Sequence, residues 1–504
     1  MRNGVTRAIL GRAPGIALKR RAQDIRQHGT HGEITRRARL RGASRRGLEL
    51  DAIIVPGSRP ATNLDHAVML AKAAGCWLLV VCSQRLRGPE VKEFLAERSF
   101  RKAIVIDLPP GYSHKLLEFP ELRSIEKELP PECNYYTTDL SMKRNIGLVL
   151  AKMMGWQRVF FLDDDIRDIA HPNLQTTIDM LGSFPAVGMR VTDFPDNSIV
   201  CHANRETKGS QDVFVSGAAL AINCDGDIGF FPDIYNEDWL FFFDNASNGR
   251  LANSCLEATQ LAYYPFASEK RAAWQEFGDV LAEGLYALLH LGRSVKDATP
   301  DYWANFLEAR RSFLEAILTR SESADLEIRD DVVSSVTSAL KSLGQIDAAL
   351  CHRYVQAWQA DLRQWKRRMA EVPADLPLQD ALTELGLSPT ATADRLWRIL
   401  PNWDLPKATI TAGPVSIPQI HTVKGLAPPA MVHQPKPRPA RAAEAAPGRH
   451  RKPRDKAKQP IAWSWRVPWT ARRAQVAAVA PSAPASVMRT DFAPPAIEET
   501  AALV

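Results

Sequence analysis

The chain has 504 residues, a net charge of +7 and 45% apolar residues, enough for a sizeable core and for two or three ordinary domains. Its seven cysteines are scattered without a C-x-x-C pair, which argues against a disulfide framework or a zinc ribbon. No run of about eighteen apolar residues is present, and the basic N-terminus has no apolar segment. We therefore expect neither a membrane span nor a secretory signal, and a cytoplasmic location.

The charge is unevenly divided along the chain. Residues 1–49 carry about ten more basic than acidic side chains and residues 424–473 about eleven more, so the middle is acidic by roughly fourteen. We expect a basic disordered arm over 1–49 and a Pro- and Ala-rich, mostly disordered basic tail over 373–504. Trp463, Trp465 and Trp469 lie among arginines in this tail. Such tails suit the inner face of a membrane, a polyanion or a partner protein, and these alternatives stay open.

Strand and helix patterns alternate between the two tails. In chain order we expect a strand at 51–58, a helix at 63–74, a strand at 77–82, a helix at 88–98, a strand from 102, a helix at 141–155, a strand at 158–162, a helix near 173–181, a strand at 186–191, a polar stretch at 192–211, a strand at 212–223 and a short strand near 261–264. This order predicts an α/β fold with a Rossmann-like, doubly wound, mostly parallel sheet over 50–270. Residues 271–372 follow a helical pattern and are predicted to be a C-terminal helical extension.

The stretch RVFFLDDD, from Arg158 to Asp165, is the most informative part of the sequence. A buried strand runs directly into three carboxylates, and ligands of open α/β sheets collect at the carboxyl ends of the strands. Because side chains alternate along an extended chain, we expect Asp163 and Asp165 to point the same way and Asp164 to point opposite. Carboxylates this close repel one another unless a cation lies between them, and a hard divalent ion is the natural partner. An acidic loop that closes a strand is the simpler alternative.

Lys143 and Arg144 lie in the first turn of the preceding helix. Cations at this end of a helix oppose its dipole. A bound phosphate would remove the conflict. Alternatively, both side chains extend into solvent.

Several segments in this order resemble GT-A fold glycosyltransferases of the large family-2 type. These are VPGSRP after the first strand, KRNIGLVLAKMMGWQRVFFLDDDI in the middle, and SGAALAI followed by NEDW, and the resemblance covers roughly residues 51–270. It implies that Asp163 and Asp165 hold Mn²⁺ or Mg²⁺ against the diphosphate of a UDP- or GDP-sugar, with Asp165 the direct ligand and Asp164 able to substitute in register. Such an ion would neutralise the charge that develops on the leaving diphosphate.

The resemblance also implies that Pro56, Ser58 and Arg59 lie against the nucleoside and that Asp163 and Asp164 contact the nucleotide-sugar. From their positions and residue types we expect the same site to include Ser83, Lys143, Arg144, Gly217 and Ala218. The catalytic pair is Glu237 and Asp238, with Asp238 the general base of an inverting transfer and Glu237 a supporting residue. His202 is expected in a polar loop, as a contact for metal or phosphate or as an ordinary loop histidine. Gly217 has packing as an alternative, and Trp239 is either a wall for a sugar ring or part of the core.

Departures from the family pattern limit this interpretation. VVCSQ offers Ser83 and Gln84 where the family commonly has an Asp, so the base is undefined. The Q-x-x-R-W motif of processive synthases is absent from the sequence, which favours transfer of a single sugar. Other classes are a phosphohydrolase or phosphotransferase of the haloacid-dehalogenase type, a sugar nucleotidyltransferase, and a non-enzymatic scaffold that binds polyanions. Arg167 stands where the first of these usually has a small hydroxyl residue, and its acids normally follow the first strand.

Overall fold

The computed structural model describes residues 34–37, 47–136, 138–192, 194, 197–210, 214–323, 326–387 and 397–399. Nearly all of the predicted tail over 373–504, including its three tryptophans, lies outside the described residues, as does most of the predicted arm over 1–49. Two residues of that arm form a strand, β1 (Arg36–Arg37), which pairs with β9. No helix of the described residues is both long and apolar enough to cross a membrane.

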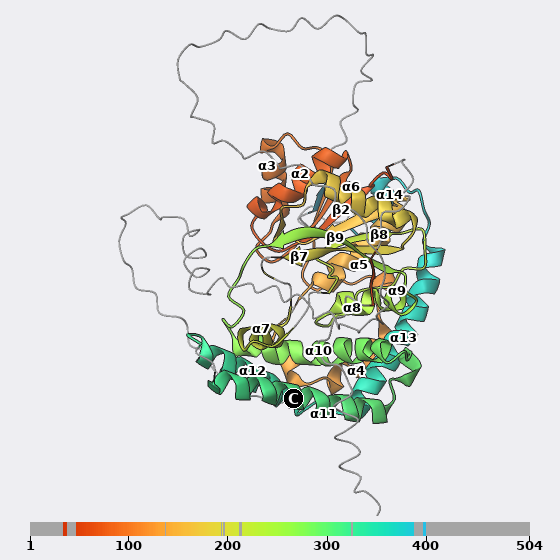
Figure 1. The fold of residues 1–504 in the computed structure, drawn as a ribbon. Helices are drawn as coiled ribbons and strands as arrows, with labels where there is room; N and C mark the ends of the chain where they lie inside the picture. Colours follow the sequence, from red (N-terminus) through yellow and green to blue (C-terminus); the bar gives the residue numbers. More distant parts are fainter. Residues whose placement is uncertain are drawn as a thin grey trace, which may run out of the picture. The chain divides into compact units, whose positions relative to one another are not determined.

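A ten-stranded sheet forms the centre of the described structure (Figure 1). Besides β1, its strands are β2 (Ala52–Gly57), β3 (Trp77–Cys82), β4 (Ala103–Asp107), β5 (Arg158–Leu162), β6 (Ile166–Arg167), β7 (Ala186–Thr192), β8 (Ala219–Asn223), β9 (Leu251–Gln260) and β10 (Trp397–Ile399). The order is β1-β9-β7-β8-β5-β2-β3-β4-β10, with β6 on β9. β5, β2, β3 and β4 are parallel to one another, and β8 runs antiparallel to β5 and β7. The predicted α/β class with a mostly parallel sheet is confirmed, and it is compatible with a Rossmann-like fold.

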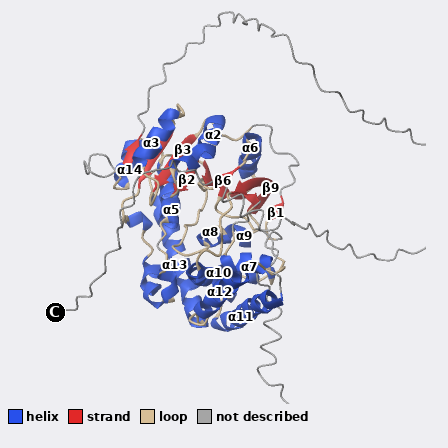
Figure 2. Cartoon of the chain, turned by 90° about the vertical axis from the view of Figure 1, so that its left-hand side faces the viewer, coloured by secondary structure: helices blue, strands red, loops and turns tan. Residues whose placement is uncertain are grey.

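Helices cover both faces of the sheet (Figure 2). One face carries α2 (Asp65–Ala74), α3 (Gly88–Glu97) and α6 (His171–Asp179). The other carries α5 (Leu140–Met153), α8 (Glu237–Phe241) and α9 (Phe243–Ser247), with α10 (Glu269–His290) beyond them. The remaining helices are α4 (Pro120–Ile125), α7 (Ile199–Glu206), α11 (Pro300–Ser323), α12 (Arg329–Leu343), α13 (Ala348–Glu371) and α14 (Leu378–Glu384).

Alternating side chains of the central strands divide the core in two. Ile53 and Val55 of β2 join the apolar cluster under α2, α3 and α6, and Ile54 joins the cluster that continues through α5 to α10–α13. α5 packs closely on the sheet because Gly147 has no side chain, and a Cβ there would lie 2.9 Å from Ile54 Cγ2. This close packing brings the first turn of α5 to the carboxyl ends of the strands.

Two predicted segments are wrong. The polar stretch 192–211 contains α7, whose Ser198 hydroxyl accepts from the Cys201 N–H at 3.3 Å. Its buried side packs on α10 and α12. Tertiary contacts therefore stabilise a helix that could not be predicted from its polar composition. The strand expected near 261–264 does not form, and β9 ends directly before it, at Gln260. β9 was missed because LANSCLEATQ is largely small and polar, and only four of its ten residues are buried.

The predicted domain boundaries remain predictions, and one of them coincides with a helix of the structure. The expected division at 270/271 falls inside α10. β8 also begins later than expected, at Ala219.

Candidate active site

A cleft of about 400 Å³ opens where β2, β3 and β5 end, bounded also by the start of α5, the loop before α8 and the first turns of α10. Ten charged side chains line it: the six acids Asp139, Asp163, Asp164, Asp165, Glu237 and Asp238, and the four bases Arg59, Lys143, Arg144 and Arg271. Their formal sum is therefore −2. A cleft with this balance attracts cations and repels a free diphosphate, unless a divalent cation accompanies it.

The carboxylate triplet lies in a turn rather than in an extended strand. The chain turns at Asp164 and Asp165. Backbone N–H groups of Ser58 and Arg59 donate to Asp164 Oδ2 at 2.7 and 2.9 Å. The Arg59 guanidinium contacts Asp164 and also Asp165, whose Oδ2 lies 2.9 Å from Nη2. The expectation that Asp164 points away from its neighbours is thus wrong, because alternation requires an extended backbone.

Asp165 is buried beneath the Arg59 guanidinium. It is 5% exposed, and the side-chain amide of Gln260 in β9 donates to its Oδ2 at 3.3 Å. Burial raises the pKa of Asp165, while Arg59 opposes the shift. A nearby positive charge therefore stabilises the ionised form of Asp165, and Arg59 provides that charge in this structure.

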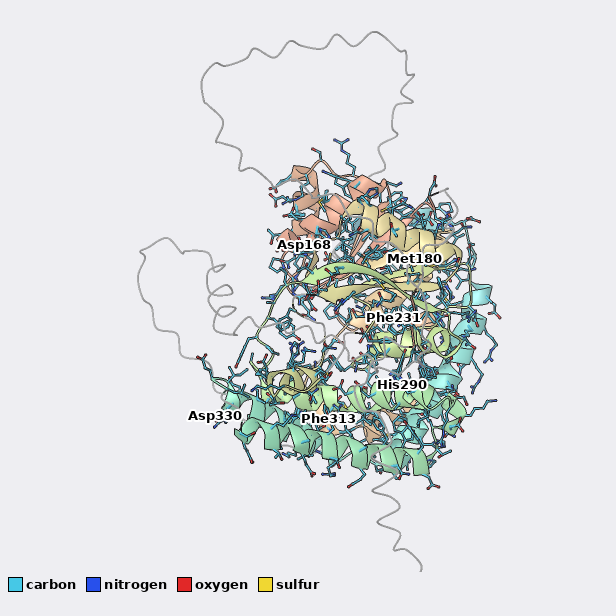
Figure 3. The ribbon with its side chains drawn as sticks, in the orientation of Figure 1. Asp168, Met180, Phe231, His290, Phe313 and Asp330 are labelled. Carbon is cyan, nitrogen blue, oxygen red and sulfur yellow. The ribbon has the colours of Figure 1, made fainter. Side chains whose placement is uncertain are left out.

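Lys143 and Arg144 do not extend into solvent as one alternative supposed, since they are 1% and 2% exposed. The Lys143 ammonium donates to the carbonyl of Gly57 at 2.9 Å and pairs with Asp139 at 2.9 Å. Arg144 Nη2 contacts both oxygens of Asp163, at 2.9 and 3.1 Å, while Nη1 pairs with Glu237. Figure 3 labels Phe231, whose ring centre lies 5.4 Å from the Arg144 guanidinium carbon. Arg144 thus links the acids that follow β5 to those at the start of α8, whereas Lys143 joins α5 to the end of β2.

Glu237 and Asp238 are the first two residues of α8 and have different partners. Asp238 Oδ2 accepts from the Gly217 N–H at 2.6 Å, and Oδ1 accepts from the Trp239 N–H at 2.8 Å. Burial raises the pKa of both acids, while Arg144 opposes the shift. Both line the cleft, so two carboxyl groups that retain protons more readily than usual face the triplet.

Three other predicted contacts lie outside the cleft wall as the described residues define it: Ser83, Gly217 and Ala218. A Cβ on Gly217 would lie 2.8 Å from Arg144 Nη1, so this glycine makes room for the guanidinium rather than for a sugar. Ser83 is buried and its neighbour Gln84 lines the cleft, with a left-handed backbone (φ 54°) that turns the chain there. Pro56, also predicted, lines the cleft.

His202 is on α7 rather than in a loop, and it is absent from the cleft wall formed by the described part of the chain. Its ring stacks on Phe194 with centroids 4.8 Å apart, and Nδ1 lies 2.9 Å from an Arg205 nitrogen. Burial lowers the pKa of His202 well below its ordinary value, helped by Arg205 and Arg271. The environment is that of a neutral, packed histidine.

Several cleft residues were not predicted from the sequence. Asn236, Gln260, Tyr263, Arg271 and Trp274 line the cleft and come from the loop before α8, from β9 and the segment after it, and from α10. Arg271 and Trp274 lie in a helix whose pattern predicted packing alone. A signal was available only for Asn236, which directly precedes the Glu-Asp pair.

A divalent cation fits this donor set only together with a substrate. Among the described residues, no group of three His, Cys, Asp or Glu side chains could hold a metal ion. Mg²⁺ is nevertheless commonly bound by one or two carboxylates, water and substrate phosphates. Asp163 already gives both oxygens to Arg144, which leaves Asp165 as the better ligand.

The sequence and the fold were compared with those of known proteins. The sequence matches no protein-family profile and no curated protein. Among solved structures, the fold is similar to a mannosyltransferase from Pyrobaculum calidifontis in complex with GDP-mannose and Mn²⁺, with 12% identity over 69% of this chain and 93% of that chain. The TM-score is 0.28, too low for the similarity to indicate what this chain does.

Proposed function

We propose that the chain is a metal-dependent glycosyltransferase that moves a single sugar from a nucleotide-diphosphate sugar to an acceptor hydroxyl. One observation carries the proposal. The triplet from Asp163 to Asp165, of which Asp164 and Asp165 are buried, lies at the carboxyl end of β5 and shares a cleft of formal charge −2 with the buried acid pair Glu237 and Asp238. The triplet forms one acidic wall of the cleft, which suits a cation with a diphosphate. The Glu237–Asp238 pair forms the second acidic wall, which suits proton transfer.

The donor half of the site would be built around Asp165 and Arg59. Asp165 would hold Mn²⁺ or Mg²⁺, which as a Lewis acid neutralises charge on the leaving diphosphate. Arg59 is 40% exposed and can leave the carboxylates for a phosphate oxygen, whereas Asp164 keeps its two backbone N–H bonds. The nucleoside would lie along Pro56 and Gln84, at the ends of β2 and β3.

Asp238 would act as the general base. Its two oxygens are held by backbone N–H groups, which fix its position, and its raised pKa makes it a stronger base than an exposed aspartate. The acceptor oxygen would attack the anomeric carbon while the bond to the diphosphate breaks and the hydroxyl proton passes to Asp238. Attack opposite the leaving group inverts the anomeric configuration. Glu237 would hold Arg144, and through it Asp163, in place.

Thermal-shift measurements with UDP, GDP and dTDP, each with Mn²⁺ or with EDTA, test the donor site. A nucleotide that binds should stabilise the protein only with Mn²⁺, by about 2.7 kcal/mol at a hundredfold excess over its Kd. Equal stabilisation in EDTA contradicts the metal role. Absence of any stabilisation by all three nucleotides contradicts the proposed function itself.

A further inference from the structure

A second cavity, of about 360 Å³, lies between α10, α12 and the segment before α5. Figure 1 shows α10 and α12 side by side, in agreement with their contacts. Its wall combines the hydroxyl side chains of Ser334, Thr337 and Ser338 with the ring of Tyr135, which is 44% exposed. Hydroxyl groups around an aromatic ring suit a ligand that has both apolar faces and many hydrogen-bonding groups.

The charges of this cavity cancel. Lys270 and Lys341 oppose Glu132 and Glu269 in its wall. The Lys270 ammonium also lies 5.8 Å from the centre of the Tyr135 ring. An anion or a cation would therefore find no net attraction here, in contrast to the cleft. A neutral polar ligand is favoured.

Glu132 has hydrogen-bonding capacity left over. It is 5% exposed, and its Oε1 accepts from the Gln345 side-chain amide at 2.6 Å. Oε2 is buried and has no hydrogen-bond partner among the described residues. A carboxylate oxygen accepts only, so the group that would satisfy it is a donor such as a hydroxyl.

Three aromatic side chains, Trp274, Tyr136 and Tyr235, lie between this cavity and the cleft, and we call them the aromatic ridge. Trp274 lines the cleft and Lys270 lines the cavity; these residues are four apart on α10, so their Cβ atoms are about 5–6 Å apart. Tyr136, 38% exposed, packs against Trp274 with ring centroids 5.6 Å apart, and Tyr235 packs against Trp274 at 5.5 Å. Consecutive exposed tyrosines, Tyr135 and Tyr136, thus lie at the border of two polar hollows.

We propose that the cleft, the aromatic ridge and the second cavity together bind an oligosaccharide acceptor. This inference rests on the proposed function of the cleft. A pyranose ring has C–H groups on its faces, which pack on aromatic rings, and hydroxyl groups around its edge, which suit Glu132 and the three hydroxyl side chains. The terminal sugar lies in the cleft near Asp238, and the preceding units cross Trp274 and Tyr136 towards Tyr135.

Saccharide titrations test the inference on the full-length protein with Mn²⁺ and UDP or GDP. Mannotriose, maltotriose and chitotriose are each compared with their monosaccharide by ligand-detected NMR and tryptophan fluorescence. At least one trisaccharide should bind about tenfold or more tighter than its monosaccharide. Tyr135→Ala removes an exposed ring, and Thr337→Trp fills the cavity from an exposed position, so both should fold and remove most of this difference. Leu291→Ala, exposed beyond the other end of α10, is the control and should change nothing.

The outcomes separate the two proposals. If a nucleotide binds with Mn²⁺ but no trisaccharide binds better than its monosaccharide, the acceptor inference is overturned and the proposed function stands. Equal binding by Tyr135→Ala, Thr337→Trp and the unaltered protein also overturns it. If no nucleotide binds but a trisaccharide does, and both variants weaken it, the saccharide site stands and the proposed transfer function falls.

Discussion

Replacing Arg59 by Gln should tighten the binding of Mn²⁺ alone and weaken the binding of Mn²⁺ with a nucleotide diphosphate. The Arg59 guanidinium contacts Asp164 and Asp165, so in the absence of substrate it occupies the positive position that a metal ion needs. The variant should fold, because Asp164 is held by backbone N–H groups of Ser58 and residue 59 that do not depend on the side chain. With the diphosphate present, the same substitution removes a cation that would contact phosphate.

The magnitude follows from the exposure of the pair. Arg59 is 40% exposed, so solvent screens its ion pairs, and each such pair contributes about 0.2–1 kcal/mol. Loss of two pairs corresponds to about 1 kcal/mol, or roughly fivefold tighter binding of Mn²⁺. Loss of a phosphate contact should cost a similar amount in the ternary complex.

Electron paramagnetic resonance of free Mn²⁺ measures this without turnover. The matched control is Arg98→Gln, which removes a guanidinium that pairs with Asp65 on a different helix. The control should leave the affinity for Mn²⁺ unchanged. Weaker or unchanged binding of Mn²⁺ by Arg59→Gln would refute the reasoning, because the arginine would then not compete with the metal.

Three further predictions concern the two acidic walls. Asp238→Asn should lose roughly 10²–10⁴ in rate yet bind nucleotide and Mn²⁺ normally, whereas Asp165→Asn should lose Mn²⁺-dependent binding; the same thermal-shift series separates them. Arg144→Met leaves the partly buried Asp163 and the buried Glu237 without their shared cation and should lower the free energy of unfolding by about 3–5 kcal/mol, measured by urea denaturation. Burial raises the pKa of Glu237 above its ordinary value of 4.5, so the folded state holds this proton to a higher pH than the unfolded chain does. Stability should therefore fall as the pH rises above about 4.5, and Glu237→Gln should reduce that slope.

The strands of the central sheet could be predicted because they are buried on both faces. β2, β3 and β5 are nearly continuous apolar runs, which have few other interpretations between helical segments. α7 and β9 could not be predicted, because their residues are largely polar and they are stabilised by neighbours distant in the sequence. The polar residues of α7 that become buried, such as His202 and Asn204, carry no local signal of burial.

The acids of the site could be predicted, but their partners could not. Asp163–Asp165 and Glu237–Asp238 stand out as charges beside apolar runs, and all five line one cleft. Arg59 and Asp164 are 105 residues apart, and Arg144 and Glu237 are 93 apart. Pairings over such distances depend on sheet order and on the depth at which α5 packs, which a single sequence does not contain. The alternation rule failed at Asp164 for a local reason, since the chain turns there.

The helical half of the chain helps to position the second acidic wall. Arg310 of α11 is fully buried and contacts Glu276 and Asp279 of α10 at 2.8–2.9 Å. Asp279 accepts from the side-chain amide of Asn236, whose left-handed backbone (φ 62°) directly precedes Glu237. The same turn of α10 packs tightly under this loop, because a Cβ on Gly278 would lie 2.2 Å from the Tyr235 carbonyl oxygen. The triplet thus depends on the sheet and the acid pair on α10 and α11, so a chain cut at residue 270 would lose the support of Glu237 and Asp238 even if the strands remained paired.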